Sequence, residues 1–259
     1  MPILFEPSVA CTGLAFVTLS NPARLGAMNR AMWAALRHAF EQAARDDTLR
    51  CVVVRGEGGA FCAGGDIAEY PAFRFHAESL RAFHEEDVWG GLRAMLQCDV
   101  PIVAQIDGAC MGAGLEIAAC CDIRIAADAA RFGAPIARLG FPMAPRELQL
   151  LTREAGRTPA RSMLLEARVF SAAEMQASGF LSRVVPGADT AMEAMATARR
   201  VCALAPQAAR LNKRMLRAMD FEPPAHASAD AEPDAYAYAD SAEHREGVAA
   251  FLQKRPPSF

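Results

Sequence analysis

The sequence predicts an α/β fold, because apolar β-branched runs alternate along it with segments of helical spacing. Two glycine-rich turns support this prediction, at residues 61–66 (FCAGGD) and 108–116 (GACMGAGLE). Each turn follows an apolar run, at 51–54 and 101–106, and leads into a helix-like segment. Backbone N–H groups at such helix starts are unpaired and can bind an oxygen that carries negative charge. Two converging turns could therefore build an oxyanion hole.

Length and composition limit the classes of protein to which the chain can belong. A chain of 259 residues suits one large domain, or one domain with a smaller appendage. Its 53% hydrophobic and 22% charged residues are typical of a soluble globular protein with a sizeable core. The net charge of -3 gives no general reason to bind nucleic acid or an anionic membrane. No uncharged apolar run reaches the roughly 18–20 residues of a membrane span, and no signal-peptide pattern opens the chain, so we expect a cytoplasmic protein.

The eight cysteines have no spacing typical of metal ligands, so we expect no metal site. Most lie in apolar stretches, which is typical of reduced, buried thiols. Cys62 could in principle be a nucleophile, but no histidine is placed beside it by motif, which favours packing. The cysteines are Cys11, Cys51, Cys62, Cys98, Cys110, Cys120, Cys121 and Cys202.

The first elements follow from apolar patterning and turn residues. Residues 3–19 hold two apolar runs around Cys11-Thr12-Gly13, which predicts a hairpin. Residues 29–45 have helical spacing, and Asn29 is a suitable N-cap. The strand at 51–54 and the first glycine turn come next.

The middle of the chain repeats strand and helix. Residues 77–97 predict one amphipathic helix, and residues 101–106 predict a strand that ends at the second glycine turn. A buried helix at 113–121 and a short strand at 123–126 follow. Gly108, Gly112 and Gly114 do not follow the order of a dinucleotide-binding fingerprint.

After Pro186 the pattern becomes helical and rich in alanine, so we divide the chain into regions 1–187 and 188–259. Residues 189–219 predict helix, residues 221–234 predict a loop, and residues 240–254 predict a last helix. Exposed alanine and methionine faces on such helices are typical of interaction elements, so we expect an oligomer.

Several motifs occur together in one order along almost the whole chain. They are Asn21-Pro22 with residues 25–29, residues 61–67, residues 108–116 with Cys121-Asp122, residues 132–135, residues 139–142, residues 246–252, and residues 254–257. With these residues the chain resembles the crotonase superfamily, also called the enoyl-CoA hydratase/isomerase family. Any one motif is weak, but the ordered set is highly specific.

The resemblance implies a fold and a chemistry. The fold is a crotonase-like spiral of ββα repeats with a C-terminal helical region that packs trimers, often as dimers of trimers. Region 1–187 is then the acyl-CoA-binding core and region 188–259 the helical trimerisation region. Members bind acyl-CoA thioesters and stabilise a thioester enolate, so coenzyme A enters as part of the substrate and no other cofactor is implied.

Three catalytic residues are implied by position. The oxyanion-hole N–H groups fall on Gly65 and Ala113, where they would meet the charge that develops on the thioester oxygen. Glu116 matches the hydratase glutamate that activates water. The alternative for Glu116 is a buried, hydrogen-bonded carboxylate that caps a helix.

One position departs from the family pattern. The second catalytic glutamate of the hydratases should follow residues 132–135 directly, and Ile136 stands there. Isoleucine cannot move a proton, so the two-glutamate mechanism does not carry over, and neither does the simple isomerase mechanism that relies on this position. Residues 143–147 (MAPRE) also replace the usual glycine-rich stretch.

Three explanations of Ile136 stay open. Another acid, from among His84, Glu85, Glu86 and Glu147, could reach the α-carbon, although each alone is typical of a surface charge. The reaction could instead need one carboxylate, as in decarboxylation or thioester hydrolysis. The chain could also bind acyl-CoA with little catalysis. We favour an enoyl-CoA hydratase-like lyase in which Glu116 is the acid/base.

The resemblance also implies contacts with coenzyme A. Arg24 stands where relatives place a basic residue near the nucleotide, and Lys254 matches a lysine that approaches from a neighbouring subunit. The backbone at Ala63, Gly65 and Ile67 is expected to line the adenine and pantetheine path. Asp66 is typical of a helix N-cap. Some relatives bind RNA, but this acidic chain has no extended basic run, so nucleic acid is not an expected partner.

Overall fold

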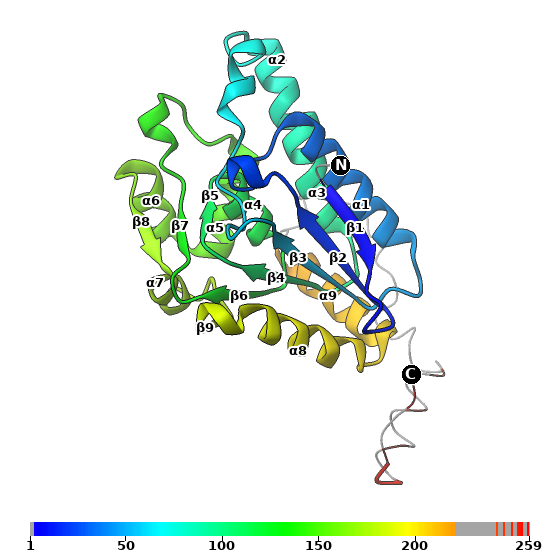
Figure 1. The fold of residues 1–259 in the computed structure, drawn as a ribbon. Coiled ribbons are helices and arrows are strands. Elements are labelled where there is room, and N and C mark those ends of the chain that lie inside the picture. Colours follow the sequence, from blue (N-terminus) through cyan, green and yellow to red (C-terminus); the bar gives the residue numbers. More distant parts are fainter. Residues whose placement is uncertain are drawn as a thin grey trace.

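The computed structural model describes residues 3–220 together with residues 242, 246, 250, 253–255 and 258 (Figure 1). A six-stranded sheet runs through its centre in the order β1-β2-β3-β4-β6-β9. β1 pairs antiparallel with β2, and every later neighbour in this sheet is parallel. The strands are β1 (Ile3–Pro7), β2 (Leu14–Leu19), β3 (Cys51–Gly56), β4 (Ile102–Ile106), β6 (Ile123–Ala127) and β9 (Arg183–Val185).

A second, three-stranded sheet makes the architecture a spiral. It consists of β5 (Ala109–Met111), β7 (Arg131–Gly133) and β8 (Val169–Ser171), in that order. β4 continues into β5, and β6 continues into β7, so these two turns of the chain each add one strand to each sheet. β3 follows the same route, because Cys62 forms a parallel bridge with Cys110 of β5. The sequence prediction missed the strand β5 inside the second glycine turn.

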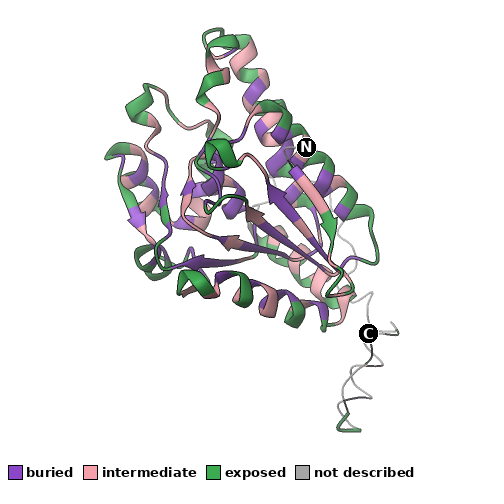
Figure 2. Ribbon diagram, in the orientation of Figure 1, coloured by how far each residue is buried: buried purple, intermediate pink, exposed green. Residues whose placement is uncertain are grey.

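Both faces of the main sheet are covered. Val52 and Val54 of β3 belong to the large core cluster beneath α1 (Arg30–Arg45) and α3 (Trp89–Gln97). The alternating residues Cys51 and Val53 pack on the other face with residues of α8 (Thr190–Cys202). Because both faces are buried, the strand is a continuous apolar run (Figure 2).

The predicted first helix is present as α1, and its cap is the one expected. The Asn29 side chain accepts a hydrogen bond from the Met32 N–H at 2.9 Å. Trp33, Leu36 and Phe40 lie on the apolar side of α1 and are buried.

Replacing Asn29 by alanine is expected to destabilise the fold by about 1 kcal/mol, because the Met32 N–H loses its acceptor. For a chain of this size that corresponds to a fall in Tm of roughly 2–4 °C. Thermal unfolding of Asn29→Ala and of the capping variant Asn29→Asp tests this. An unchanged Tm in Asn29→Ala would show that the cap is dispensable.

The segment predicted as one helix at 77–97 is helical throughout, but its hydrogen bonding changes in the middle. It consists of α2 (Ala77–Ala82), a π-helical segment η3 (Phe83–Val88) and α3. A π turn takes more residues than an α turn, so it changes the direction in which later side chains point. The predicted helix is therefore present, and its π segment is a feature that hydrophobic spacing does not report.

The remaining elements connect the strands. They are η1 (Pro22–Arg24), η2 (Ile67–Ala72), α4 (Ala113–Ala119), η4 (Ile136–Leu139), α5 (Pro145–Ala155), α6 (Arg157–Leu165), α7 (Ala172–Ala177), η5 (Gly187–Asp189) and α9 (Pro206–Asp220). The predicted buried helix at 113–121 is α4, which ends two residues earlier. None of the helices in the described part of the chain is long and apolar enough to cross a membrane.

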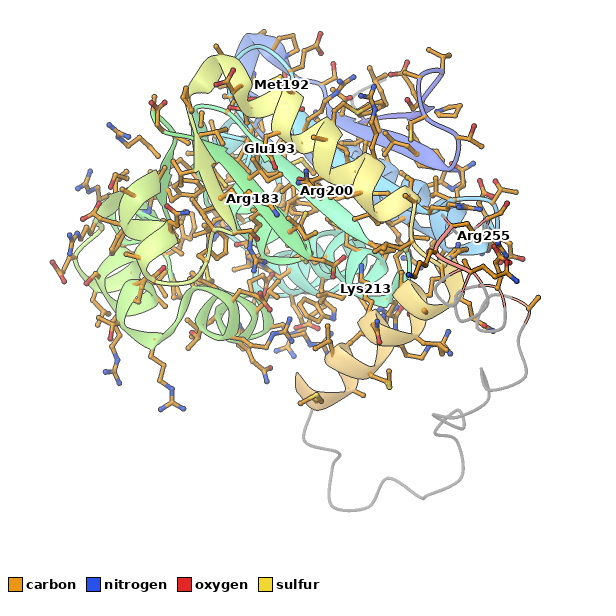
Figure 3. The ribbon with its side chains drawn as sticks, turned by 90° about the horizontal axis from the view of Figure 1, so that it is seen from below. Arg183, Met192, Glu193, Arg200, Lys213 and Arg255 are labelled. Atoms are coloured by element: carbon orange, nitrogen blue, oxygen red, sulfur yellow. The ribbon has the colours of Figure 1, made fainter. Side chains whose placement is uncertain are left out.

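The C-terminal helices α8 and α9 form ion pairs as well as apolar contacts. The Lys213 Nζ lies 2.8 Å from an Asp122 oxygen, and Arg214 and Arg217 of α9 both pair with Asp99. On α8, Glu193 pairs with Arg200 (Figure 3). The stretch predicted as helical at 189–219 forms two helices, α8 and α9. The predicted loop at 221–234 lies outside the described residues, as does most of the predicted helix at 240–254, and the division at residue 187 stays a prediction.

Candidate active site

The two glycine-rich turns meet through their backbones. The Cys62 N–H donates to the Ala109 carbonyl, and the Met111 N–H donates to the Cys62 carbonyl, both at 2.9 Å. Gly114 lies against this contact, since a Cβ there would stand 2.5 Å from the Cys62 oxygen. The convergence that the sequence predicts is therefore present, and it requires glycine at position 114.

Gly65 and Ala113 present their N–H groups at this junction. The Gly64 carbonyl and the Asp66 N–H bond to Met28, so the N–H of the intervening Gly65 points away from Met28. Ala113 is the first residue of α4, where N–H groups have no partner within the helix. Within residues 3–220, neither N–H donates to a backbone carbonyl. Both residues line one cavity.

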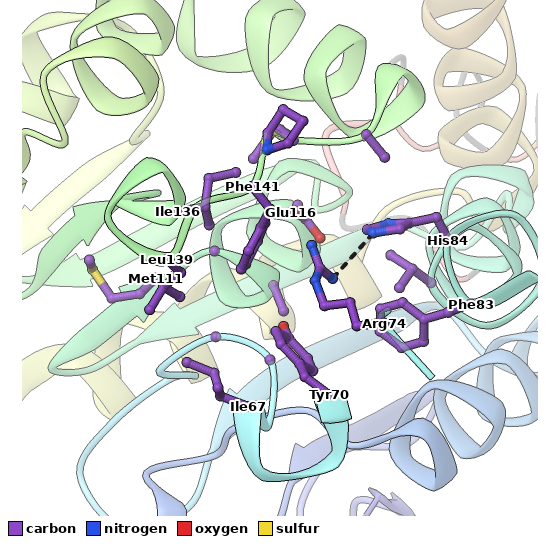
Figure 4. Close-up of a pocket in the computed structure, with 18 of the residues that line it drawn as sticks. Ile67, Tyr70, Arg74, Phe83, His84, Met111, Glu116, Ile136, Leu139 and Phe141 are labelled. Atoms are coloured by element: carbon purple, nitrogen blue, oxygen red, sulfur yellow. Dashed lines mark hydrogen bonds between the residues drawn. The ribbon is translucent and has the colours of Figure 1, made fainter. Parts of the chain in front are cut away.

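That cavity has a volume of about 260 Å³ and mostly apolar walls (Figure 4). Its walls come from the two turns, η2, η3, and the segment from Pro135 to Ala144. Its lining includes Trp33, Phe83, Val88, Ile136, Leu139, Phe141 and Met143. A cavity of this kind suits an acyl chain more than a polar ligand.

Glu116 reaches the cavity from the first turn of α4, three residues after Ala113. Burial raises the pKa of its carboxyl to about 8, and the nearby charge of Glu147 contributes in the same direction. No hydrogen bond from residues 3–220 reaches this carboxyl, so the helix-capping alternative has no partner there. A pKa near the working pH is what a proton-transfer group needs.

The position of the second hydratase glutamate is apolar here, because Ile136 lines the same cavity. Of the four acids proposed in its place, Glu85 is exposed and pairs with Arg146 at 3.0 Å, and Glu86 is exposed. They are surface charges, as expected.

His84 and Glu147 contradict the expectation of surface charges. Glu147 of α5 is only 2% exposed, and its Oε1 lies 3.0 Å from Nδ1 of His84. The His84 ring lines the cavity from the π-helical segment η3 (Figure 4). The structure thus brings an imidazole–carboxylate pair close to Glu116.

Arg74 is a cavity residue that the sequence reasoning missed. Its Nη1 lies 3.5 Å from Nε2 of His84, and its guanidinium lies 3.7 Å from the centre of the Phe141 ring. Position 74 carries no sequence signal, because it lies in a short irregular segment between η2 and α2.

Three of the five residues expected to contact coenzyme A line the cavity. Ala63, Gly65 and Ile67 line the cavity. Arg24 pairs with Asp66 at 2.6 Å beside the first turn, and Asp66 caps η2 through the Ala68 N–H as expected. Lys254 is exposed and does not line the cavity, so its role stays a prediction.

Cys62 behaves as a packing residue. Its side chain is fully buried, and burial raises the pKa of the thiol to about 12, which leaves no thiolate at neutral pH. Among the described residues, no group of three His, Cys, Asp or Glu side chains is arranged to hold a metal ion.

Comparison with known proteins agrees with this geometry. The family model for enoyl-CoA hydratase/isomerase matches residues 10–259. A Mycobacterium bovis protein named probable enoyl-CoA hydratase echA8 is 34% identical over 244 residues, which cover 94% of this chain and 93% of that protein. The 2,3-dehydroadipyl-CoA hydratase of Escherichia coli is 32% identical, with 94% and 93% covered.

A solved structure has the same fold as this chain. The crystal structure of an enoyl-CoA hydratase/carnithine racemase from Magnetospirillum magneticum superposes with a TM-score of 0.92 at 37% identity. The match covers 100% of this chain and 95% of that one. The spiral of paired strands is therefore the crotonase fold, and the chain belongs to the enoyl-CoA hydratase/isomerase family.

Proposed function

We propose that this protein adds water to the double bond of a 2-enoyl-CoA thioester. The observation that carries the proposal is the arrangement of two unpaired N–H groups, on Gly65 and Ala113, beside the carboxyl of Glu116 in one apolar cavity. The thioester oxygen accepts hydrogen bonds from both N–H groups. Its negative charge grows as the enolate forms, so the two donors stabilise the transition state more than the substrate.

Glu116 completes a balanced reaction without a second glutamate. Its carboxylate takes a proton from water while the water oxygen bonds to the β-carbon and the double-bond electrons move toward the thioester. The enolate then collapses, and the α-carbon takes a proton from the carboxylic acid form of Glu116. One carboxyl returns the proton it removed, which is consistent with an isoleucine at position 136.

Binding and assembly follow from the same proposal. Coenzyme A is part of the substrate, and no further cofactor is required. Arg24 contacts the nucleotide, and Lys254 reaches it from a neighbouring subunit in a homotrimer or dimer of trimers. The exposed side chains of Leu216 and Met219 on α9 support an assembly that covers this surface. The protein works in the cytoplasm.

Purified protein incubated with 2-enoyl-CoAs of several lengths is expected to consume the conjugated thioester and yield 3-hydroxyacyl-CoA. Loss of enoyl-thioester absorbance and mass spectrometry of the product measure this. Release of CO₂ from malonyl-type thioesters, or of free CoA from 3-hydroxyacyl-CoAs, would instead favour the one-carboxylate alternatives. Binding without any turnover across this panel would contradict the proposal.

The rate of hydration is expected to depend on pH through Glu116. The base form is the carboxylate, and a pKa of about 8 leaves it a minority below that pH. We expect kcat/KM for hydration to rise about tenfold per pH unit below pH 8 and to level off above it. A rate that stays flat between pH 6 and pH 8 would contradict a catalytic base with a pKa of about 8.

A further inference from the structure

Arg74 places a permanent positive charge in the cavity wall. A guanidinium carries five N–H donors and stays charged at all working pH values. Among the described residues, the side-chain hydrogen bond of Arg74 is the 3.5 Å contact with the His84 ring, and no carboxylate pairs with it. Arg153 and Arg214, which are also partly shielded from solvent, each pair with a carboxylate. Shielded charges in proteins are normally paired, so Arg74 has capacity for an anion.

The side chain is held in place rather than free to swing. Its guanidinium lies over two aromatic rings, 3.7 Å from the centre of Phe141 and 4.6 Å from that of Tyr70. His84 contacts one edge, and Glu147 in turn fixes His84. Stacking fixes the plane of the group and leaves its remaining N–H donors available at the edges. Such a fixed fork suits the two oxygens of a carboxylate.

The charge of the cavity is not balanced by its other lining residues. Its titratable lining residues are Tyr70, Arg74, His84 and Glu116. Glu116 is mostly protonated at neutral pH, because burial raises its pKa to about 8. The buried carboxyl of Glu147 does not contact Arg74 directly, because the His84 ring lies between them and contacts both. A neutral acyl chain would therefore leave the Arg74 cation without a carboxylate in direct contact.

Arg74 lines both the cavity that holds the proposed thioester site and a second cavity. It lines a neighbouring cavity of about 710 Å³, which it shares with Tyr70, His84 and Phe141. None of Gly65, Ala113 and Glu116 lines that second cavity. An acyl chain bound at the two N–H donors would meet Arg74 with its distal part. Figure 4 shows the Arg74 side chain turned toward the His84 ring.

We propose that the acyl group of the substrate carries a carboxylate at its distal end and that Arg74 binds this carboxylate through two N–H donors. The substrate class is thus the mono-CoA thioester of an unsaturated dicarboxylic acid. This inference rests on the proposed function, since it takes the Gly65 and Ala113 donors as the thioester site.

Binding of saturated thioesters tests the inference without turnover. Calorimetry compares two acyl-CoAs of equal length, one ending in a carboxylate and one in a methyl group, with wild type and Arg74→Met. We expect wild type to bind the carboxylated thioester about 10- to 100-fold more tightly, and Arg74→Met to lose that preference. Equal weakening of both ligands would overturn the inference, because Arg74 would then contact coenzyme A or support the fold.

Turnover of the matched enoyl-CoAs gives a second readout. We expect the ratio of kcat/KM values, carboxylated over neutral, to fall toward one in Arg74→Met. Arg146→Met is the control, because Arg146 is an exposed arginine already paired with Glu85, and it should keep the wild-type ratio. Wild-type turnover with no preference for the carboxylated substrate would refute the inference but leave hydration intact. Preferential binding without turnover would support the carboxylate site and refute hydration.

Discussion

Replacing Ala113 by proline is expected to lower kcat for enoyl-CoA hydration by about 10²–10³-fold. Proline has no N–H, so the substitution deletes one of the two donors proposed for the thioester oxygen. Losing one such donor typically costs about 2.7–4 kcal/mol of barrier. Steady-state kinetics should show the loss in kcat and in kcat/KM, since the proline Cδ also occupies the place of the N–H that meets the thioester oxygen.

The local backbone accommodates this substitution. Ala113 is the first residue of α4, the helical position at which proline is most easily tolerated. The preceding Gly112 has φ 47° and ψ -111°, which is outside the α region that proline disfavours in its predecessor, and glycine has no Cβ to clash. Misfolding is therefore not expected to contribute to the loss of activity. Circular dichroism measures whether the fold is retained.

Ala113→Gly is the matched control because it keeps the N–H group while also changing the side chain. It should retain most of the wild-type kcat. Full activity in Ala113→Pro would remove Ala113 from the catalytic donors. An equal loss in both variants would assign the effect to packing at the start of α4.

Glu116→Gln is expected to reduce kcat for hydration by about 10²–10⁴-fold, because glutamine is similar in shape but cannot take a proton from water. With Ile136 in the second position, no glutamate there can substitute for it. The comparison uses the same enoyl-CoA at pH 8. Residual activity close to that of wild type would show that Glu116 is not the acid/base.

The same substitution should make the protein more stable in alkaline solution. The folded-state pKa of about 8 lies above the ordinary value of 4.5, so folding favours the protonated carboxyl. The contribution of this group to stability is complete below about pH 4.5 and is lost as the pH rises through 8. Glu116→Gln should therefore match the wild-type Tm at pH 4.5 and exceed it at pH 9. A lower Tm at pH 9 would contradict the raised pKa.

The sequence predicts those parts of the site that depend on neighbouring residues in the chain. Apolar runs followed by glycine turns indicate the strands and the helix starts, so local pattern and family resemblance are enough to propose Gly65, Ala113 and Glu116 as site residues. Asn29 and Asp66 are recognised as caps for the same reason, because each acts on residues two or three positions away.

The other half of the cavity depends on residues that meet only in the folded chain. His84 and Glu147 are 63 positions apart, and their contact needs both the π-helical segment η3 and the placement of α5. Hydrophobic periodicity does not report a π segment. Arg74 lies in an irregular segment that has no periodicity, so its position over Phe141 follows from tertiary packing alone.

The contact of Gly114 with the Cys62 carbonyl has a consequence for how this fold changes its specificity. Main-chain atoms set the spacing between the two turns, so it does not depend on the side chains of the cavity wall. Residues such as Leu139, Phe141 and Met143 can be exchanged while the distance between the two N–H groups stays the same. Under the proposed mechanism, the scaffold therefore separates charge stabilisation at the thioester from the choice of acyl group. Protein engineering can therefore alter the wall for new acyl chains without rebuilding the reaction centre.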